Sequence, residues 1–442
     1  MIARKLTPCE FARAIRNGLG SAFLHITTYG DKGVDDCVRD ACVNNLIYDS
    51  QLENGRANWL TNMIVRSGQL AFYANEIKIA LKRIPEDVGD FDQLVWLAVN
   101  LYELGFSECG EALLTLFHQE CTPENYSIAL LCALVNIAGL SGLNKAVHWL
   151  IRECPDDDSN MVELAKHAVS QFNKDCIEEV FADGAYNDPE IEAFVQAVNA
   201  FNKLWEGAPH TPEPAPLLAL SDVIHLARSS TKHGYIRGLL EFGQNAPTAD
   251  LTEICTKLEQ ENSPFSQCAY LQVFRKRPLP RVTHELLRLL NSPDKRVRHN
   301  SLLAFSRTRD ALLRAEALRF IDSDQEADIS AAFDLLEANY AHGDSQRFQQ
   351  ALTKVQDREY LNSVALSLIR LEELWPLEEF TNSLLHLLEY GPCGCCRRNI
   401  LEALHKRRAA PDQMVFEAQW DANYEVQHVA RRIVQEGSLD EK

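Results

Sequence analysis

The stretch PRVTHELLRLLNSPDKRVRHNSLLAF, residues 280–305, decides the fold class of this chain. On each side of a short break at residues 291–294, apolar side chains recur every three or four residues, which is the spacing of one face of an α-helix. Pro280 stands before the first helix, and Asp294 is a typical cap for the second. The stretch therefore predicts a helix, a tight turn and a helix. The two stripes are Val282, Leu286, Leu289 and Leu290, and Val297, Ser301, Ala304 and Phe305.

The second stripe recurs along the carboxyl-terminal half of the chain. Its copies follow one another at intervals of 30 to 35 residues, which is the period of stacked helical hairpins. Each hairpin has one apolar face that it buries against its neighbours, so several copies together form a continuous core. The predicted leading residues of the second helices are Phe265, Val297, Ile329, Leu361, Cys396 and Val426.

The segment Ser292-Pro293-Asp294-Lys295-Arg296-Val297-Arg298-His299 resembles the opening of the second helix in HEAT repeats, which belong to the armadillo-like α-solenoids. The family typically has an acid, a Val-Arg pair and a small residue at this place. The resemblance covers about residues 262–437 and implies that Asp294 and Arg298 form hydrogen bonds between neighbouring repeats. It also places Arg397 at the position of Arg298. Ser330, Asn362 and Gln427 stand there in other copies.

The whole chain is expected to be all-α, an α-solenoid of stacked antiparallel hairpins in two lobes. Residues 1–206 form an irregular lobe of helical hairpins without a clean period. Residues 207–216 hold four prolines, which cannot continue a helix, and form the connection. Residues 217–437 form the HEAT-like lobe, and 438–442 are a tail. The two lobes could pack into one curved superhelix.

The composition of the chain limits the kinds of protein that it can be. The chain has 442 residues, 46% of them hydrophobic, and a formal charge of −19, so it can fold without disulfides and repels bare nucleic acid overall. Its longest apolar run, residues 128–135, is too short to cross a bilayer, and residues 1–20 lack the apolar core of a secretory signal. We expect a cytoplasmic protein with reduced cysteines, no membrane and no cofactor.

Three local features are weighed for chemistry. Cys393, Cys395 and Cys396 lie close together, but their spacing is wrong for a familiar zinc site, and the repeat places Cys396 in the core. The acidic stretch 86–92 lacks the ligand order of a calcium loop and reads as a solvated turn with a helix cap. Lone histidines have no recognisable nucleophile or acid partner, so no catalytic or metal-binding residue is assigned. Examples are His25, His148 and His233.

A basic segment stands out in the acidic chain. Residues 275–319 hold twelve Lys or Arg against four acids and are net +8. Lys295, Arg296 and Arg298 fall in the opening turn of a helix, where the dipole disfavours cations while free backbone N–H groups favour an anion. Asp294 or an acid of the next repeat could instead neutralise Arg298. The candidate macromolecule-binding residues are Arg275, Lys276, Arg277, Arg281, Lys295, Arg296, Arg298 and His299.

The function expected from these features is that of a non-catalytic scaffold or adaptor, which binds a protein partner within a larger complex. The alternative is a nucleic-acid-binding HEAT-like protein, regulatory or similar to the HEAT-like DNA glycosylases, that uses the basic segment 275–319. A metal-dependent enzyme or a lyase would need a constellation of residues that the sequence does not present.

Overall fold

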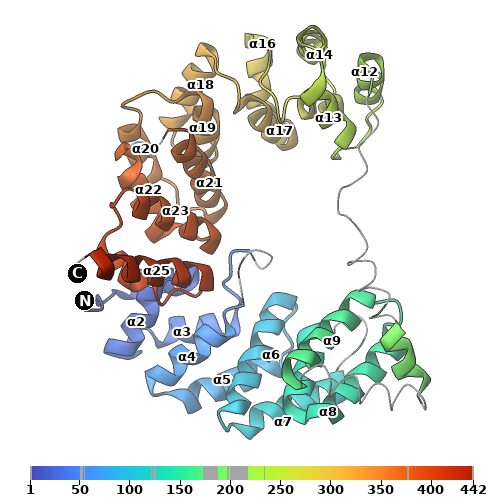
Figure 1. The fold of residues 1–442 in the computed structure, drawn as a ribbon, viewed down its shortest axis with the longest axis vertical. Coiled ribbons are helices and arrows are strands. Elements are labelled where there is room, and N and C mark those ends of the chain that lie inside the picture. The colour runs from blue at the N-terminus through green and yellow to red at the C-terminus, as the bar shows by residue number, and fades with distance from the viewer. Residues whose placement is uncertain are drawn as a thin grey trace. The chain divides into compact units, whose positions relative to one another are not determined.

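A computed structural model of the chain describes residues 2–49, 53, 55–120, 122, 126–172, 188–196, 199, 218–232, 234–375 and 378–440 (Figure 1). Regular structure in these residues is helical and includes no strand, so the all-α prediction is confirmed. The packing separates unit 1, Met1–Thr211 with Gln413–Lys442, from unit 2, Pro212–Asp412. The division between Thr211 and Pro212 falls inside the expected connection 207–216, which lies outside the described residues.

Unit 1 arranges its helices in two rows. Along the chain, α1, α3, α5 and α7 pack successively against one another, and so do α2, α4, α6 and α8. Each odd helix and the even helix after it thus form one hairpin, and consecutive hairpins bury their apolar faces together. The helices are α1 (Pro8–Asn17), α2 (Gly20–Tyr29), α3 (Asp35–Val43), α4 (Ala57–Ser67), α5 (Leu70–Leu81), α6 (Val88–Glu103), α7 (Ser107–Glu120), α8 (Ile128–Glu153) and α9 (Asp158–Phe172).

Helix α8 is, by length and apolar composition alone, the one helix of the described chain that could cross a membrane. Gly139 interrupts it with a φ of 60° and a ψ of −141°, a conformation open to glycine but not to residues with a Cβ. Helix α8 packs against α6, α7 and α9. Half of its most apolar window is buried, as in the core helix of a globular unit.

The carboxyl-terminal segment completes unit 1. It consists of α24 (Asp412–Ala418) and α25 (Tyr424–Asp440), and Figure 1 shows both chain ends in this unit. The backbone N–H of Ala422 donates to Gly18 O at 2.7 Å, and a Cβ on Gly20 would lie only 1.8 Å from Glu417 O. The sequence analysis placed residues 413–437 in the second lobe, as part of 217–437. The structure packs this segment against the first helices of unit 1. A period counted along the chain does not reveal such a contact between distant segments.

Unit 2 also has two rows. Its second helices α15, α17, α19, α21 and α23 pack one on the next, while α18, α20 and α22 follow one another on the other side. The helices are α12 (Leu220–Arg228), α13 (Arg237–Asn245), α14 (Thr248–Gln260), α15 (Pro264–Gln272), α16 (His284–Leu287) with the 3₁₀ turn η1 (Arg288–Asn291), α17 (Lys295–Phe305), α18 (Ala311–Ile321), α19 (Glu326–Asn339), α20 (Ser345–Leu352), α21 (Arg358–Leu374), η2 (Glu378–Phe380), α22 (Thr381–Tyr390) and α23 (Gly394–Lys406).

The predicted leading residues of the second helices are buried in five of six cases. Phe265 is the exception, at 36% exposure, because the buried face of α15 begins one residue later, at Ser266. Asp294 caps α17 as predicted, since its side chain accepts from the N–H groups of Arg296 and Val297. The five buried leading residues are Val297, Ile329, Leu361, Cys396 and Val426.

Candidate anion-binding pocket

Four of the eight predicted binding residues line one pocket of about 270 Å³ in unit 2. The pocket lies between the carboxyl end of α15, the first turns of α17 and the loop that precedes α13. Its predicted members are Arg275, Lys295, Arg296 and His299, and the remaining lining residues are Gly234, Tyr235, Cys268, Gln272 and Asn300. None of these described lining residues is Asp or Glu.

The buried side chain of Gln272 fixes the loop at the rim of the pocket. Its amide nitrogen donates to Gly234 O at 2.8 Å, and its amide oxygen accepts from the N–H of Ile236 at 2.8 Å. Tyr235 stands between these two anchored residues and is 63% exposed. An anchored loop that presents an exposed aromatic ring can contact a ligand without first being ordered.

The wall opposite the loop is held by Asn300. This amide accepts from Arg275 Nη2 at 2.8 Å and donates to Arg296 O at 2.8 Å, so it orients the guanidinium of Arg275 against α17. The Nε atom of Arg275 is buried and has no hydrogen-bond partner among the described residues. A buried donor without an acceptor is costly.

Lys295 and Arg296 supply positive charge that the described chain does not neutralise. Both side chains are exposed, and neither forms an ion pair or a side-chain hydrogen bond there. Their position in the first turn of α17 is unfavourable for cations because of the helix dipole. The sequence also expected this turn to offer free N–H groups, which is wrong for two of them, because the carboxylate of Asp294 accepts from Arg296 N at 2.8 Å and Val297 N at 3.2 Å.

The other predicted residues lie outside the pocket lining, three of them because acceptors of the chain engage them. Arg277 donates to Ala246 O at 2.5 Å, and Arg281 forms an ion pair with Glu259 at 2.7 Å. Arg298 donates to Ser292 O in the turn before its own helix, and Arg397 likewise donates to Gly391 O and Pro392 O. The contact of Arg298 lies within its own hairpin, not between repeats as the resemblance implied. Lys276 is exposed and also outside the lining.

Three more arginines of the basic segment are engaged by acceptors of the chain. Arg288 donates to two backbone carbonyls, those of Glu259 and Glu261, each at 3.0 Å. Arg314 binds both carboxylate oxygens of Asp344, and Arg319 pairs with Glu316 at 2.6 Å. The net charge of +8 therefore does not form one continuous free surface. Unpaired cations of the described segment lie in the pocket, at Lys295 and Arg296, and also outside it, at Lys276 and Arg309.

A row of polar residues continues from the pocket along the second helices. Burial raises the pKa of Asp334 on α19, and nearby positive charges, among them His299, oppose the shift. Burial likewise raises the pKa of Glu337 to about 7, against the attraction of Arg370, whose Nε lies 2.6 Å from Glu337 Oε1. Ser367 donates to Asp334. These contacts join residues about one repeat apart.

Most of the described cysteines are buried in the core. Cys393 and Cys396 are buried, and a hydrogen bond with Cys393 together with burial raises the pKa of Cys396. Burial also raises the pKa of Cys268, in the pocket wall, to about 11. Thiols held in their neutral form are poor nucleophiles and poor metal ligands. Among the described cysteines there is no disulfide.

The acidic turn and the histidines also have structural roles. Asp87 caps α6 by accepting from Asp90 N at 3.1 Å, which confirms the expected helix cap in residues 86–92. His25 is buried, its Nδ1 accepts from Leu6 N at 3.0 Å, and burial lowers its pKa. His233 lies outside the described residues.

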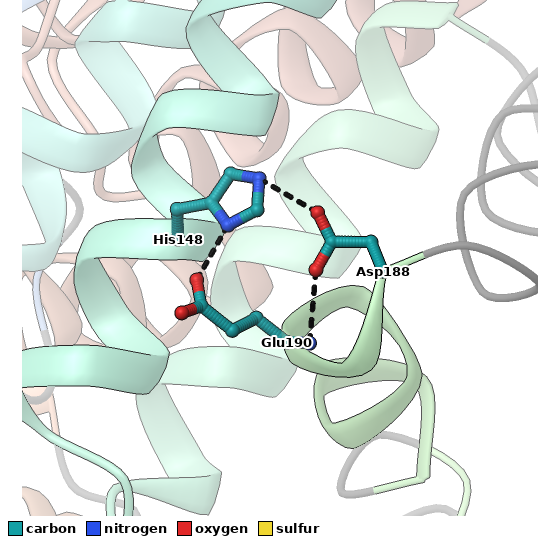
Figure 2. A group of neighbouring side chains, drawn as sticks. All are labelled: His148, Asp188 and Glu190. Carbon is teal, nitrogen blue, oxygen red and sulfur yellow. Dashed lines mark hydrogen bonds and ion pairs between the residues drawn. The ribbon is translucent and has the colours of Figure 1, made fainter.

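His148 on α8 has partners that the sequence did not reveal. Figure 2 shows its ring between Asp188 and Glu190, with Nε2 at 3.2 Å from Asp188 Oδ2 and Nδ1 at 2.5 Å from Glu190 Oε2. The ligand atoms of the three residues lie within 4.8 Å of one another, as in some metal sites. His148 thus connects α8 to residues 188–196 through both carboxylates.

Sequence reasoning missed the neutral members of the pocket. Gln272 gave a signal, because it occupies a place in the α15 stripe where the other copies have an apolar residue. A polar residue on a core face needs hydrogen-bond partners, and the partners of Gln272 are those of the pocket loop. Tyr235 and Asn300 gave no comparable signal, because neither breaks a periodic pattern.

Comparisons of the chain with protein-family models, curated proteins and solved structures found no match.

Proposed function

We propose that this chain is a non-catalytic scaffold, an α-solenoid of HEAT-like repeats that binds a protein partner within a larger complex. Support for the solenoid comes from the successive packing of α15, α17, α19, α21 and α23, with hydrogen bonds between residues about one repeat apart. Stacked hairpins of this kind give extended surfaces that bind other macromolecules. The cytoplasmic location expected from the sequence stays a prediction.

The observation that carries the binding role is the unneutralised positive charge of the pocket. Lys295 and Arg296 are exposed, Arg275 has a buried donor without an acceptor, and no acid belongs to the lining. Guanidinium and ammonium donors that converge on a small space suit a phosphate or a carboxylate. The pocket would hold one anionic side chain of the partner, with Tyr235 against the neighbouring residue.

A protein partner fits this pocket better than nucleic acid does. Nucleic-acid binding gains most of its affinity from many phosphates contacted along a groove. Here several cations of the segment are already engaged with the chain's own acceptors, including Arg281, Arg314 and Arg319. The chain also carries a formal charge of −19, which opposes binding to a polyanion in general. Nucleic-acid binding remains the alternative that the experiment must separate.

The test measures binding of labelled probes by fluorescence anisotropy at low and at physiological salt. The probes are a short peptide with one phosphoserine, the same peptide with glutamate or serine at that position, and a short single-stranded DNA. We expect the two anionic peptides to bind, and the double variant Lys295→Glu with Arg296→Glu to weaken them at least about tenfold, since each charged hydrogen bond contributes about 1.5 to 3 kcal/mol.

The matched control is the double variant Lys276→Glu with Arg309→Glu. Both of these residues are exposed and outside the pocket lining, and the change in net charge is the same. We expect at most about a twofold loss, as for screened surface charges. If both double variants lost the same affinity for the anionic peptides, binding would depend on the general electrostatic field of the segment and not on the pocket. DNA that binds more tightly than every peptide would support the alternative.

A further inference from the structure

A second pocket, of about 420 Å³, lies in unit 1, where the carboxyl-terminal segment meets the first helices. We name it the Trp420 pocket. The side chains that the argument uses come from three places in the sequence. They are Phe23 on α2, Asn62 and Arg66 on α4, and Gln419, Trp420 and Tyr424 from the segment that ends the chain.

The floor of the Trp420 pocket is rigid. The indole of Trp420 stacks on Phe23, with ring centroids 5.2 Å apart and the planes 9° from parallel. Trp59 Nε1 donates to Trp420 O at 2.8 Å, which fixes the backbone at the same residue. Trp420 nevertheless keeps 36% of its surface exposed, and Tyr424 beside it is 59% exposed. The surface of Trp420 is thus held open in a fixed position, with the exposed ring of Tyr424 lining the same pocket.

Arg66 supplies the charge of the Trp420 pocket. Its guanidinium carbon lies 5.4 Å from the centroid of Phe23 and 5.8 Å from that of Trp420, so the group rests on the aromatic rings. In the described part of the chain Arg66 forms no ion pair, and the pocket lining includes a second arginine, Arg431, but no Asp or Glu. A guanidinium ordered by stacking and left without an anion is prepared to bind a carboxylate.

The uncharged polar groups point to a peptide. Amide side chains line the pocket, and each offers both a donor and an acceptor, which matches the alternating groups of an extended backbone. Trp, Tyr and Arg are also the residues that dominate binding energy in protein interfaces. Two arginines without a longer basic stripe suit one carboxylate better than a run of phosphates. The amides are those of Asn58, Asn62, Gln419 and Gln427.

We propose that the Trp420 pocket binds an extended segment of a partner protein, with a glutamate or aspartate side chain on Arg66 and the next side chain, aromatic or apolar, on Trp420 and Tyr424. This site is independent of the pocket in unit 2. A partner could use either alone, and the failure of one proposal leaves the other standing.

The experiment is a double-mutant cycle between Arg66 and the acid of the peptide. The probes are labelled, end-blocked peptides in which glutamate is followed by Phe, Tyr, Leu or Ala between glycines, each paired with a form that has glutamine instead. Binding to the full chain is followed by fluorescence anisotropy. We expect glutamate peptides with Phe or Tyr to bind at least tenfold more tightly than their glutamine forms, and Arg66→Gln to abolish that difference.

Two further variants distinguish binding in the pocket from the effect of losing a positive charge elsewhere in unit 1. Tyr424→Ala should weaken Phe and Tyr peptides about tenfold and the Ala peptide little. Arg83→Gln is the matched control, because Arg83 is exposed in the same unit and outside this pocket lining, and it should change no affinity by more than about twofold. Equal melting temperatures of all variants would show that Arg66→Gln and Tyr424→Ala leave the fold intact.

Several outcomes would overturn the proposal. One is that no glutamate peptide binds at millimolar concentration, and another is that Arg66→Gln leaves the preference for glutamate unchanged. A labelled single-stranded DNA that binds in the pocket and displaces the peptides would assign the site to nucleic acid. A dimer, seen by light scattering and lost in Arg66→Gln, would assign it to a second copy of the chain.

Discussion

Unit 1 and unit 2 pack their helices in the same two-row manner, yet only unit 2 has a period that can be read along the sequence. In unit 2 successive second helices begin at residues 264, 295, 326, 358 and 394, while in unit 1 the even helices begin at 20, 57, 88 and 128. The spacing varies more in unit 1 because its connections are unequal, with two residues between α1 and α2 and thirteen between α3 and α4. Stacking thus requires only that successive helices alternate between the two rows. A repeat that can be read along the sequence also requires connections of equal length between the helices.

The units differ as well in how they are closed. Unit 2 is one continuous stretch of chain, whereas unit 1 needs the segment after Asp412 to cover its first helices. Substitutions in the two units can test this difference in closure, the energetic cost of a buried acid in unit 2 and the contribution of a helix cap in each unit.

The largest expected effect is that of Gly20→Ala in unit 1. The new Cβ would lie 1.8 Å from Glu417 O and 2.8 Å from the carbonyl carbon of Trp420, so the backbone of the terminal segment must move. We expect unit 1 to lose about 3 kcal/mol or more, the upper range for overpacking, and residues 413–431 to exchange amide hydrogens faster. Calorimetry and hydrogen exchange of the full chain measure these two quantities.

Two other glycines sharpen that result. Gly437→Ala, on α25, is the control, because nothing lies within 4 Å of its added Cβ, and it should stabilise the helix by about 0.5 to 1 kcal/mol. Gly243→Ala is the counterpart in unit 2, since its Cβ would meet Val273 O at 1.8 Å. It should destabilise unit 2 and leave exchange in residues 413–431 unchanged. Normal exchange there in Gly20→Ala would contradict the closure of unit 1 by its last segment.

An intermediate effect is expected from Glu337→Gln in unit 2. Because burial raises the pKa of Glu337 from 4.5 to about 7, the folded chain keeps this proton in that window while the unfolded chain releases it. The contribution of Glu337 to stability therefore falls as the pH rises from about 4.5 to 7. Glutamine cannot ionise, so the variant should gain about 1 to 3 kcal/mol at pH 8 and nothing below pH 4.5.

Chemical denaturation at several pH values measures this gain. The matched control is Glu285→Gln, an exposed acid of the same unit, which should change stability by less than about 0.5 kcal/mol at every pH. A loss of stability in Glu337→Gln at pH 8 would show instead that the ion pair with Arg370 outweighs the cost of burying the carboxylate.

The smallest expected effect concerns the helix caps, of which Asp87 serves unit 1 and Asp294 serves unit 2. Replacement of either by alanine should cost about 1 kcal/mol. Asp294→Asn retains a capping oxygen but removes a negative charge beside the candidate anion-binding pocket, so it should leave the melting temperature nearly unchanged and tighten the phosphopeptide severalfold. The reference is Asp87→Asn, which makes the same change at the cap in unit 1. If Asp294→Asn bound the phosphopeptide no more tightly than Asp87→Asn does, the phosphate would not lie beside α17.

The sequence predicted the all-helical class, the second helices of unit 2, the cap Asp294 and four of the nine residues that line the pocket. The helices and the cap are local features, since an apolar stripe or a cap is determined by residues three or four positions apart. The other candidates Arg277, Arg281 and Arg298 lie outside the lining, because acceptors elsewhere in the chain engage them. The Trp420 pocket was beyond sequence reasoning, since Trp59 and Trp420 meet across 361 positions of chain.

The construction of unit 1 from both parts of the chain has a consequence for biosynthesis. A ribosome delivers the first helices, then all of Pro212–Asp412, and only afterwards the residues that stack on Phe23 and donate to Gly18 O. Unit 2 is continuous and can fold as soon as it emerges, because domains generally fold as units during synthesis. The first helices must wait through that whole interval with Phe23 and Trp59 uncovered. During translation, therefore, helices α1 to α4 are made before unit 2 but gain their last packing partners only after it.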